Sequence, residues 1–173
     1  NEKKVIADAT ILPNPLYKID AATYLEYHTM MNTMEHEVTK MHQLINSINA
    51  KRTQLEGILH SLSKDEKNTS LKKEGEILVK KMKVWDEDMV QRRSKAYDDV
   101  ENFENKFTAN YMFLINQTES DLPRVNQPNV DRLKELNITW VTLKAKADEI
   151  MNKDIPALNK LLWAAGVGAI WEK

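Results

Sequence analysis

Residues 24–62 read YLEYHTMMNTMEHEVTKMHQLINSINAKRTQLEGILHSL, and this stretch decides the fold. Its apolar side chains recur at alternating spacings of three and four residues, and Arg52 is the only polar member of the series. A period of 3.5 residues sustained over this length predicts one long α-helix with a narrow apolar seam. At about 1.5 Å per residue, a helix over 21–62 spans roughly 60 Å, so we expect an elongated domain. The seam consists of Tyr24, Tyr27, Met31, Met34, Val38, Met41, Ile45, Ile48, Arg52, Leu55, Leu59 and Leu62.

The residues on either side of this stretch set the ends of the long helix. Asp20 is a favourable N-cap residue, and Pro13 and Pro15 forbid a helix before it. We therefore predict an extended arm or linker over 1–19, lying on the domain surface, and a helical bundle domain over 20–173. A last strand of a preceding domain is the alternative for the arm, because its apolar residues favour β structure. The polar residues 63–70 break the seam and predict a turn.

Further seams of the same spacing predict the remaining helices. We expect them at about residues 70–92, 103–118 and 130–153, followed by a short helix at 155–164. The second seam holds Leu71, Gly75, Leu78, Met82, Trp85 and Met89; the third holds Phe103, Phe107, Tyr111, Leu114 and Ile115; the fourth holds Leu133, Leu136, Trp140, Leu143, Ala147 and Ile150. Residues 93–102 have weak periodicity and predict a longer connection.

Local signals predict where the later helices begin and end. Asn129, after a loop with two prolines, is expected to cap the fourth helix. Asp154 followed by Pro156 predicts either a kink or a fresh helix start with Asp154 as N-cap. No seam can remain in water alone, so each must face another. The prediction is an all-α fold: an elongated up-and-down four-helix bundle with one long N-terminal helix and an extended N-terminal arm.

Composition excludes several classes of protein. The chain of 173 residues has 25 Lys plus Arg and 26 Asp plus Glu, so it has no net field to attract nucleic acid. It has no cysteine, which excludes disulfides and thiolate chemistry. No run of about 18 apolar residues occurs, so we expect no membrane span. The basic clusters at 80–83 and 92–93 are interleaved with acidic residues and are interpreted as solvated faces.

The first helix carries residues that resemble metal ligands. A carboxylate-bridged di-metal bundle needs Glu-x-x-His on two helices, and that motif is absent. His28, Glu35 and His42 recur every seven residues, which separates neighbours by about 10.5 Å along the helix. One ion cannot reach all three, so we predict no metal, no cofactor and no catalytic residue. The residues considered are Glu26, His28, Glu35, His36, Glu37 and His42.

Methionine and tryptophan side chains offer a second kind of candidate site. The methionines resemble an adaptable binding groove, but most lie on seams and are interpreted as core. Trp85 and Trp140 also lie on seams and are predicted to be buried. The C-terminal residues are too apolar for a free tail and are expected to dock on the bundle or on a neighbour. We therefore predict a possible interdomain contact at Trp163, Ile170 and Trp171.

The C-terminal stretch resembles a known family. Residues 154–162 read DIPALNKLL and residues 165–170 read AGVGAI, which is similar to the end of large bacterial exported proteins frequent in Bacteroidetes. These are the sortilin-like, glycosyl-hydrolase-related proteins with Asp-box (BNR) repeats. In them a β-propeller precedes a helical C-terminal region that closes on a similar Asp-x-Pro-Ala-Leu-Asn pattern. The resemblance covers about residues 8–171, since the long first helix, residues 85–91 and the loop at Pro123 also fall in a similar order. The Asp-box itself, Ser-x-Asp-x-Gly-x-Thr-Trp, does not occur in this chain.

The resemblance implies a function for the chain. It implies the C-terminal helical domain of an exported protein (periplasmic, cell-surface or secreted) that packs on the preceding β-propeller or on a protein partner. Any glycosidase-like residues of such a parent protein would lie outside this chain, so we expect a non-catalytic module. The alternatives are a free-standing helical adaptor or self-associating coiled coil and, less favoured, a ligand- or metal-binding bundle. The oligomeric state is open, with a monomer favoured.

Overall fold

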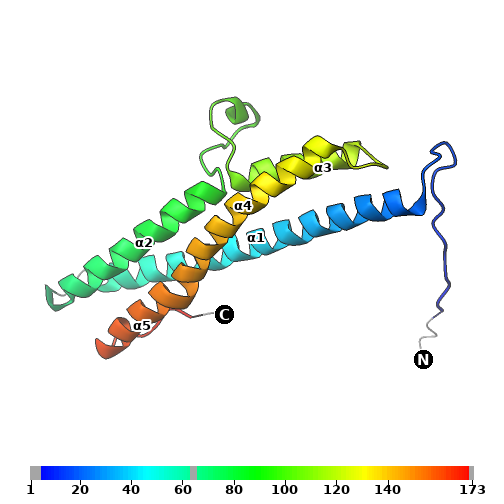
Figure 1. Cartoon of the computed structure of the whole chain (residues 1–173). Helices are drawn as coiled ribbons and strands as arrows, with labels where there is room; N and C mark the ends of the chain where they lie inside the picture. The colour runs from blue at the N-terminus through cyan, green and yellow to red at the C-terminus, as the bar shows by residue number, and fades with distance from the viewer. Residues whose placement is uncertain (1–4, 63–65, 172–173) are drawn as a thin grey trace.

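The computed structural model describes residues 5–62 and 66–171, and every regular element within them is a helix (Figure 1). The predicted all-α fold, with four helices, a long N-terminal helix and an extended arm, is confirmed. The elements are α1 (Ala21–Leu62), η1 (Glu66–Asn68), α2 (Thr69–Met89), η2 (Tyr97–Glu101), α3 (Phe107–Ser120), α4 (Gln127–Glu149), η3 (Ile150–Asp154) and α5 (Ile155–Ala164).

Helix α1 begins at the predicted cap. The side-chain Oδ1 of Asp20 accepts hydrogen bonds from the backbone N–H of Thr23 at 2.8 Å and from its hydroxyl at 2.7 Å. The backbone bond is the larger cause of a lowered pKa of Asp20, because it stabilises the charged carboxylate. From Met31 to Leu62 every apolar member of the predicted seam is buried, which is why α1 stays unbroken over 42 residues.

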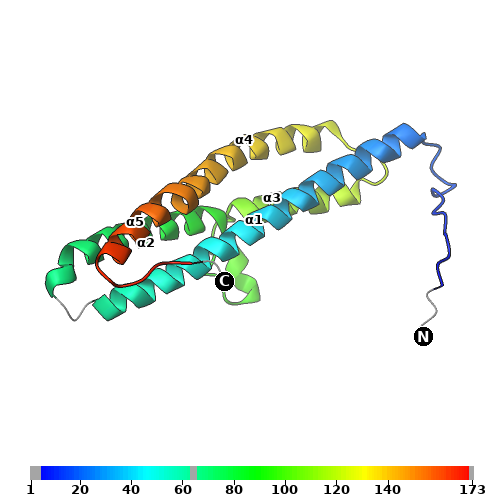
Figure 2. The same cartoon turned by 90° about the horizontal axis from the view of Figure 1, so that it is seen from below.

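Three rods of helix lie side by side along the molecule. Helix α2 packs against the C-terminal half of α1 and α3 against its N-terminal half, so α2 and α3 follow one another along one line (Figures 1 and 2). Both run antiparallel to α1. Helix α4, η3 and α5 form the third rod, which runs in the same direction as α1. The hydroxyl of Thr108 donates to the carbonyl of Met89 at 2.8 Å, so the end of α2 touches the start of α3.

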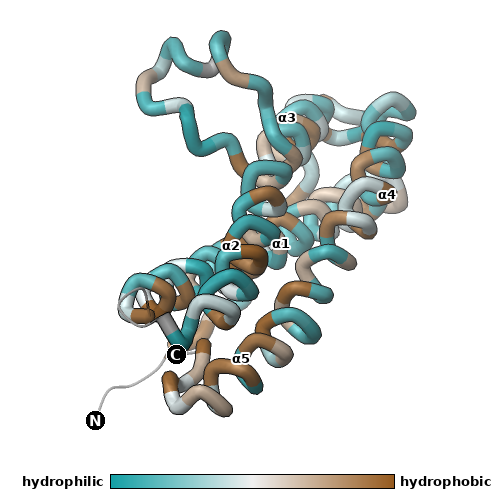
Figure 3. Tube along the Cα trace, turned by 90° about the vertical axis from the view of Figure 1, so that its left-hand side faces the viewer, coloured by the Kyte–Doolittle hydropathy of each residue, from teal (hydrophilic) through white to brown (hydrophobic). Residues whose placement is uncertain are grey.

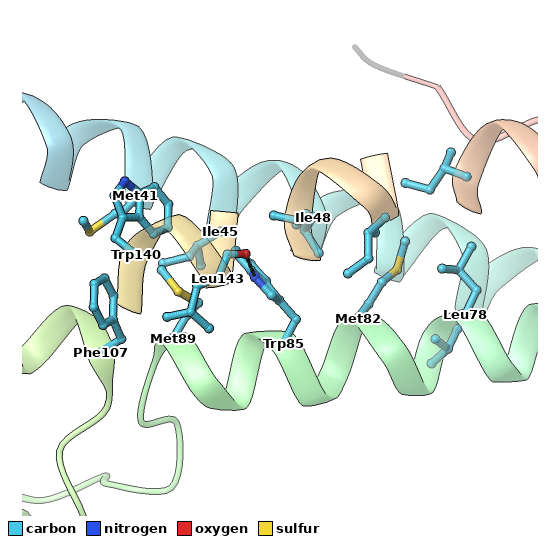
Figure 4. Packing of buried hydrophobic residues seen from close by; sticks show 14 of the residues in the cluster. Met41, Ile45, Ile48, Leu78, Met82, Trp85, Met89, Phe107, Trp140 and Leu143 are labelled. Atoms are coloured by element: carbon cyan, nitrogen blue, oxygen red, sulfur yellow. Dashed lines mark hydrogen bonds between the residues drawn. The ribbon is translucent and has the colours of Figure 1, made fainter. Parts of the chain in front are cut away.

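The core lies where the seams of the three rods meet (Figure 4). Trp85 of α2 is buried between α1 and α4, and its Nε1–H donates to the carbonyl of Leu143 at 2.8 Å. Phe107 of α3 stacks on Trp140 of α4 with ring centroids 5.9 Å apart. Trp85 and Trp140 are thus core residues, as predicted. Each fully buried side chain of leucine size contributes about 1.5–3 kcal/mol to stability.

The connection between α2 and α3 is longer than expected. Helix α2 ends at Met89 instead of near residue 92, and α3 begins at Phe107 instead of near 103. Phe103, which was placed on the third seam, lies outside the helix. The Arg93 guanidinium stands 4.6 Å from the centre of its ring, so this aromatic side chain packs within the connection itself.

The start of α4 also differs from the prediction. The cap is Asn126, not Asn129: the Oδ1 of Asn126 accepts from the backbone N–H of Asn129 at 2.8 Å. Pro128 therefore sits in the first turn of α4. That position suits proline, because the first backbone N–H groups of a helix have no partner within it.

At the Asp154–Pro156 signal a π-turn joins α4 to the short helix α5. The backbone of Asp154 is helical, and the N–H of Ile155 donates to the carbonyl of Ile150, five residues back. Pro156 has no N–H and its ring crowds the carbonyl four residues before it, so the wider turn accommodates it without ending the rod. Helix α5 begins at Ile155 as predicted and Asp154 directly precedes it, but the Asp154 side chain makes no capping hydrogen bond.

The predicted turn at 63–70 and the predicted arm at 1–19 both include residues outside the described ranges. The turn at 63–70 falls partly on 63–65, outside them; η1 and the start of α2 occupy the rest. The arm is described only from residue 5. It extends away from the bundle and does not lie on it (Figure 1): Ile11 is 96% exposed and Leu16 is 85% exposed. From Met31 onward the apolar seam of α1 is already covered by the other rods, so that part offers the arm no docking surface. The division at residue 20 stays a prediction.

Candidate interaction surface around α5

The chain turns back on itself after α5. Gly166 and Gly168 have φ angles of 70° and 100°, in the left-handed region that favours glycine. The backbone N–H of Val167 donates to the carbonyl of Leu162 at 3.0 Å, and that of Gly166 donates to Trp163 at 3.0 Å. This is the hydrogen-bond pattern of a glycine-terminated helix. It sends residues 165–171 back along the bundle (Figures 1 and 2).

The returning segment is fastened to two helices. The Asn159 side chain donates to the carbonyl of Ile170 at 3.0 Å and accepts from its N–H at 2.8 Å. The next N–H, of Trp171, donates to the Oε1 of Gln54 on α1 at 3.2 Å. The Ile170 side chain is 4% exposed and belongs to the core. The expectation that this apolar segment docks on the bundle is therefore confirmed for Ile170, which presents no surface of its own.

The two other predicted contact residues face solvent. Trp163 on α5 is 72% exposed and Trp171 is 66% exposed, whereas Trp85 and Trp140 are 2% and 6% exposed. The difference follows from position: Trp85 and Trp140 lie on seams, and Trp163 directly follows the buried Leu162 on the adjacent, outward side of α5. The predicted trio is therefore split into one core residue and two exposed aromatic side chains. Their contact with another domain stays a prediction.

A groove between α2 and the third rod adds apolar surface that the sequence reasoning missed. Two adjoining hollows, of about 410 and 260 Å³, share Ile77 and Lys81 of α2. Ile77, Val84 and Leu161 line them and are 55%, 50% and 50% exposed. Figure 3 shows α2 and α5, the helices that carry these residues, on the side of the molecule that faces the viewer. Ile77 and Val84 are seven residues apart and lie off the main seam of α2. This spacing forms a second apolar stripe, from which the groove could have been predicted.

Ion pairs cross the groove. The Nζ of Lys81 lies 2.6 Å from the Oδ2 of Asp154 and 3.2 Å from the Oε2 of Glu149. The bond to Asp154 is the main cause of a raised pKa of Lys81, and the bond from Lys81 is the main cause of a lowered pKa of Glu149. Lys146 and Asp88 form a second, longer pair at 3.4 Å. Exposed pairs of this kind add little to stability, because water and salt screen their charges.

The residues that resemble metal ligands are not brought together. His28 shares a hydrogen bond with Asn32, 2.9 Å away. Glu37 accepts from Lys40 at 2.7 Å and from the Trp140 Nε1–H at 3.0 Å, so it links α1 to α4. Within residues 5–62 and 66–171, no three His, Asp or Glu side chains are placed to hold a metal ion.

Buried polar groups serve the packing of helices. The Tyr111 hydroxyl bonds to the Oδ1 of Asn137 at 3.3 Å, joining α3 to α4. Burial, with a smaller effect of the Glu37 charge, raises the pKa of Tyr111 to about 12, so this phenol stays protonated at neutral pH. The Arg92 guanidinium bonds to the carboxylate of the buried Asp86. These contacts hold elements in place.

Comparisons with known protein families, with curated proteins and with solved structures find no match. The fold therefore defines the chain as an all-helical bundle domain, and the resemblance at residues 154–170 rests on the sequence pattern alone. No helix of the described part combines the length and the apolar character that crossing a bilayer requires.

Proposed function

We propose that this chain is a non-catalytic structural and interaction module, the C-terminal helical bundle of a larger exported protein. It packs on a preceding β-propeller or on another protein partner. The observation that supports this role is the exposure of Trp163 and Trp171, whereas the other two tryptophans of the chain are buried. Tryptophan is enriched at protein interfaces and supplies much of their binding energy.

The groove beside α5 supports the same role. Ile77, Val84 and Leu161 keep half of their surface in water although they sit next to a well-packed core. A contiguous apolar area of this kind is typical of a surface that a partner covers. The ion pairs of Lys81 connect the two walls of the groove, so this surface is present in the chain without a partner.

The alternative of a coiled coil that self-associates through α1 would need an exposed apolar seam on that helix. The α1 seam from Met31 to Leu62 is covered by α2, α3 and α4 within the same chain, so it is not available to a second copy. We infer a monomer. Sedimentation at several concentrations tests this, and a mass that rises with concentration would contradict it.

The test of the proposal uses the bundle and the propeller of the parent protein, expressed separately. We expect association that weakens by about tenfold or more on Trp163→Ala or Trp171→Ala, because hot-spot tryptophans contribute about 2 kcal/mol or more. Tyr97→Ala is the matched control, since Tyr97 is an aromatic residue 92% exposed on a different part of the surface. Absence of association, or equal effects of all three substitutions, would reject this surface as the interface.

The proposed partner and the proposed location have the same origin. Both the β-propeller and export rest on the resemblance of residues 154–170, not on the bundle's geometry. Fractionation of the source cells checks export directly. Any hydrolytic activity of the parent protein is expected to persist after its bundle is removed, because we place no catalytic group in this chain.

A further inference from the structure

The connection between α2 and α3, residues 90–106, joins two points of the bundle that lie close together. Met89 ends α2 and Thr108 is the second residue of α3, yet the Thr108 hydroxyl donates to the Met89 carbonyl at 2.8 Å. The chain thus leaves the rod and returns to almost the same point. A long surface loop with adjacent ends and its own internal contacts is frequently a functional element.

The loop is held by its own contacts, and it stands out from the rods (Figures 1 and 3). The Asp99 carboxylate accepts from the backbone N–H groups of Lys95 at 2.7 Å and Ala96 at 2.9 Å. Gln91 donates to the carbonyl of Glu104 at 3.2 Å, which ties the start of the loop to its end. These contacts within the loop add to its anchors on the bundle, which are the packing of Val90 on the core and the bond of Arg92 to Asp86.

At the base of the loop lies a hollow of about 530 Å³ with five cationic side chains in its lining. They come from three places: α1, the last turns of α2, and both ends of the loop. These cations are Arg52, Lys83, Arg92, Arg93 and Lys106. The carboxylates of Asp86 and Glu87 also line the hollow. The Glu56 carboxylate forms ion pairs with Arg52 and Lys83 of the lining. The region carries an excess of positive charge in a chain whose net charge is −1.

The local ion pairs leave part of this charge unmatched. Arg52 and Lys83 share one carboxylate, that of Glu56, at 3.0 and 2.8 Å. Arg92 is matched by Asp86. Among the ion pairs of residues 5–62 and 66–171, none involves Arg93 or Lys106. Arg93 is instead oriented by the ring of Phe103, which fixes its plane without neutralising it.

We propose that this hollow binds a small anionic ligand through its phosphate or carboxylate oxygens, held mainly by Arg93 and Lys106. A planar guanidinium presents paired N–H donors that match two oxygens of either group, and an ammonium adds a mobile third donor. Arg52 and Lys83, with one carboxylate between them, raise the local positive potential. This site is separate from the surface around α5 and does not depend on the function proposed above.

The test is calorimetric titration of the full chain at low ionic strength with inorganic phosphate and, separately, with citrate. We expect at least one of them to bind with a Kd of about 1 mM or tighter. The double variant Arg93→Gln/Lys106→Gln should weaken that binding by about tenfold or more, since it removes both unmatched cations. Binding of phosphate alone identifies a phosphate site, and binding of citrate alone identifies a carboxylate site.

The matched control is Lys134→Gln/Lys160→Gln, which removes the same charge from exposed positions outside the hollow. It should change the Kd less than twofold. The single variant Arg93→Lys keeps the charge but loses the planar fork, and should weaken binding measurably while the helical circular dichroism stays unchanged. The proposal is overturned by no binding of either probe, or by equal weakening in both double variants, which would indicate an adventitious ion only.

Discussion

Asn159 and Ile170 face each other through two hydrogen bonds, from the Asn159 amide to the Ile170 carbonyl at 3.0 Å and from the Ile170 N–H to the Asn159 oxygen at 2.8 Å. One side chain therefore satisfies both polar groups of a backbone unit whose own side chain is buried. This gives a structural reason for the asparagine that ends the Asp-Ile-Pro-Ala-Leu-Asn stretch. The other polar residue of that stretch, Asp154, bonds to Lys81.

Asn159→Ala is expected to destabilise the fold by about 1–3 kcal/mol, because it leaves a part-buried donor and acceptor without partners. Chemical unfolding monitored by circular dichroism measures the change in free energy. Asn152→Ala, at an exposed position, is the control and should stay within about 0.5 kcal/mol of the wild type. Equal effects of the two substitutions would show that the clamp contributes nothing.

Exposed and buried tryptophans should differ in how much their replacement by alanine lowers the free energy of unfolding. Trp163→Ala and Trp171→Ala remove exposed side chains and should change the free energy of unfolding by no more than about 0.5 kcal/mol. Trp85→Ala removes a buried ring and its bond to Leu143, and should cost about 3–5 kcal/mol. Denaturant curves of the isolated chain give these values, and a large loss at Trp163 would place that side chain in the core.

Two glycines in helices should respond oppositely to alanine. A Cβ at Gly57 meets nothing within 4 Å, so Gly57→Ala should stabilise α1 by about 0.5–1 kcal/mol. A Cβ at Gly75 would lie 2.5 Å from the Cδ2 of Leu59, which is buried in the core. Gly75→Ala should therefore lower the melting temperature while Gly57→Ala raises it. A rise in both would mean that Leu59 has room to move.

The contact between Glu37 and Trp140 should make stability depend on acid pH. The bond from Lys40 is the main cause of the lowered pKa of Glu37, and the bond from Trp140 adds to it. A carboxyl group whose pKa is lowered in the folded state stabilises the fold above its unfolded pKa, near 4.5. That contribution is lost as the pH falls through the folded pKa.

Unfolding of wild type and Glu37→Gln should therefore be compared between pH 7 and pH 3. The wild type should be the more stable at pH 7, and the difference should shrink as the pH falls below about 4.5. Glu26→Gln, on the same helix at an exposed position, is the control and should show a much smaller difference. A gap between wild type and Glu37→Gln that is independent of pH would contradict the ionic origin of the effect.

The fold should survive removal of the loop between α2 and α3. Replacing residues 93–105 with a short glycine–serine linker, which keeps Arg92 on the buried Asp86, is expected to preserve helical circular dichroism, because Met89 and Thr108 already touch. Loop-closure entropy changes by only about 0.6 kcal/mol for each doubling of loop length, so the change in stability should be small. Loss of cooperative unfolding would show that the loop takes part in building the bundle.

The seams were predictable because they depend on spacing alone. Met31, Ile45 and Leu59 follow a period that only one long helix can bury, and the structure buries all three. Spacing does not say which seam faces which, so the alignment of α2 and α3 along one line could not be predicted. The contact of Met89 with Thr108 depends on that alignment and leaves no trace in the sequence.

Local ambiguity explains the boundaries that were misplaced. Asn126 and Asn129 are both good caps, and only the tolerance of the first turn for Pro128 decides between them. Around α5 the sequence indicated an apolar segment, but the glycine turn at Gly166 and Gly168 determines which side chains point inward. Ile170 is buried and Trp171 is exposed as a result.

The unbroken length of α1 has a mechanical consequence. The arm joins this helix at Asp20, and the returning C-terminal segment bonds to it at Gln54. The stretch of α1 between these two points is roughly 50 Å of a single hydrogen-bonded rod. Such a domain would act as a stiff strut that keeps whatever is joined at one end a fixed distance from whatever is held at the other.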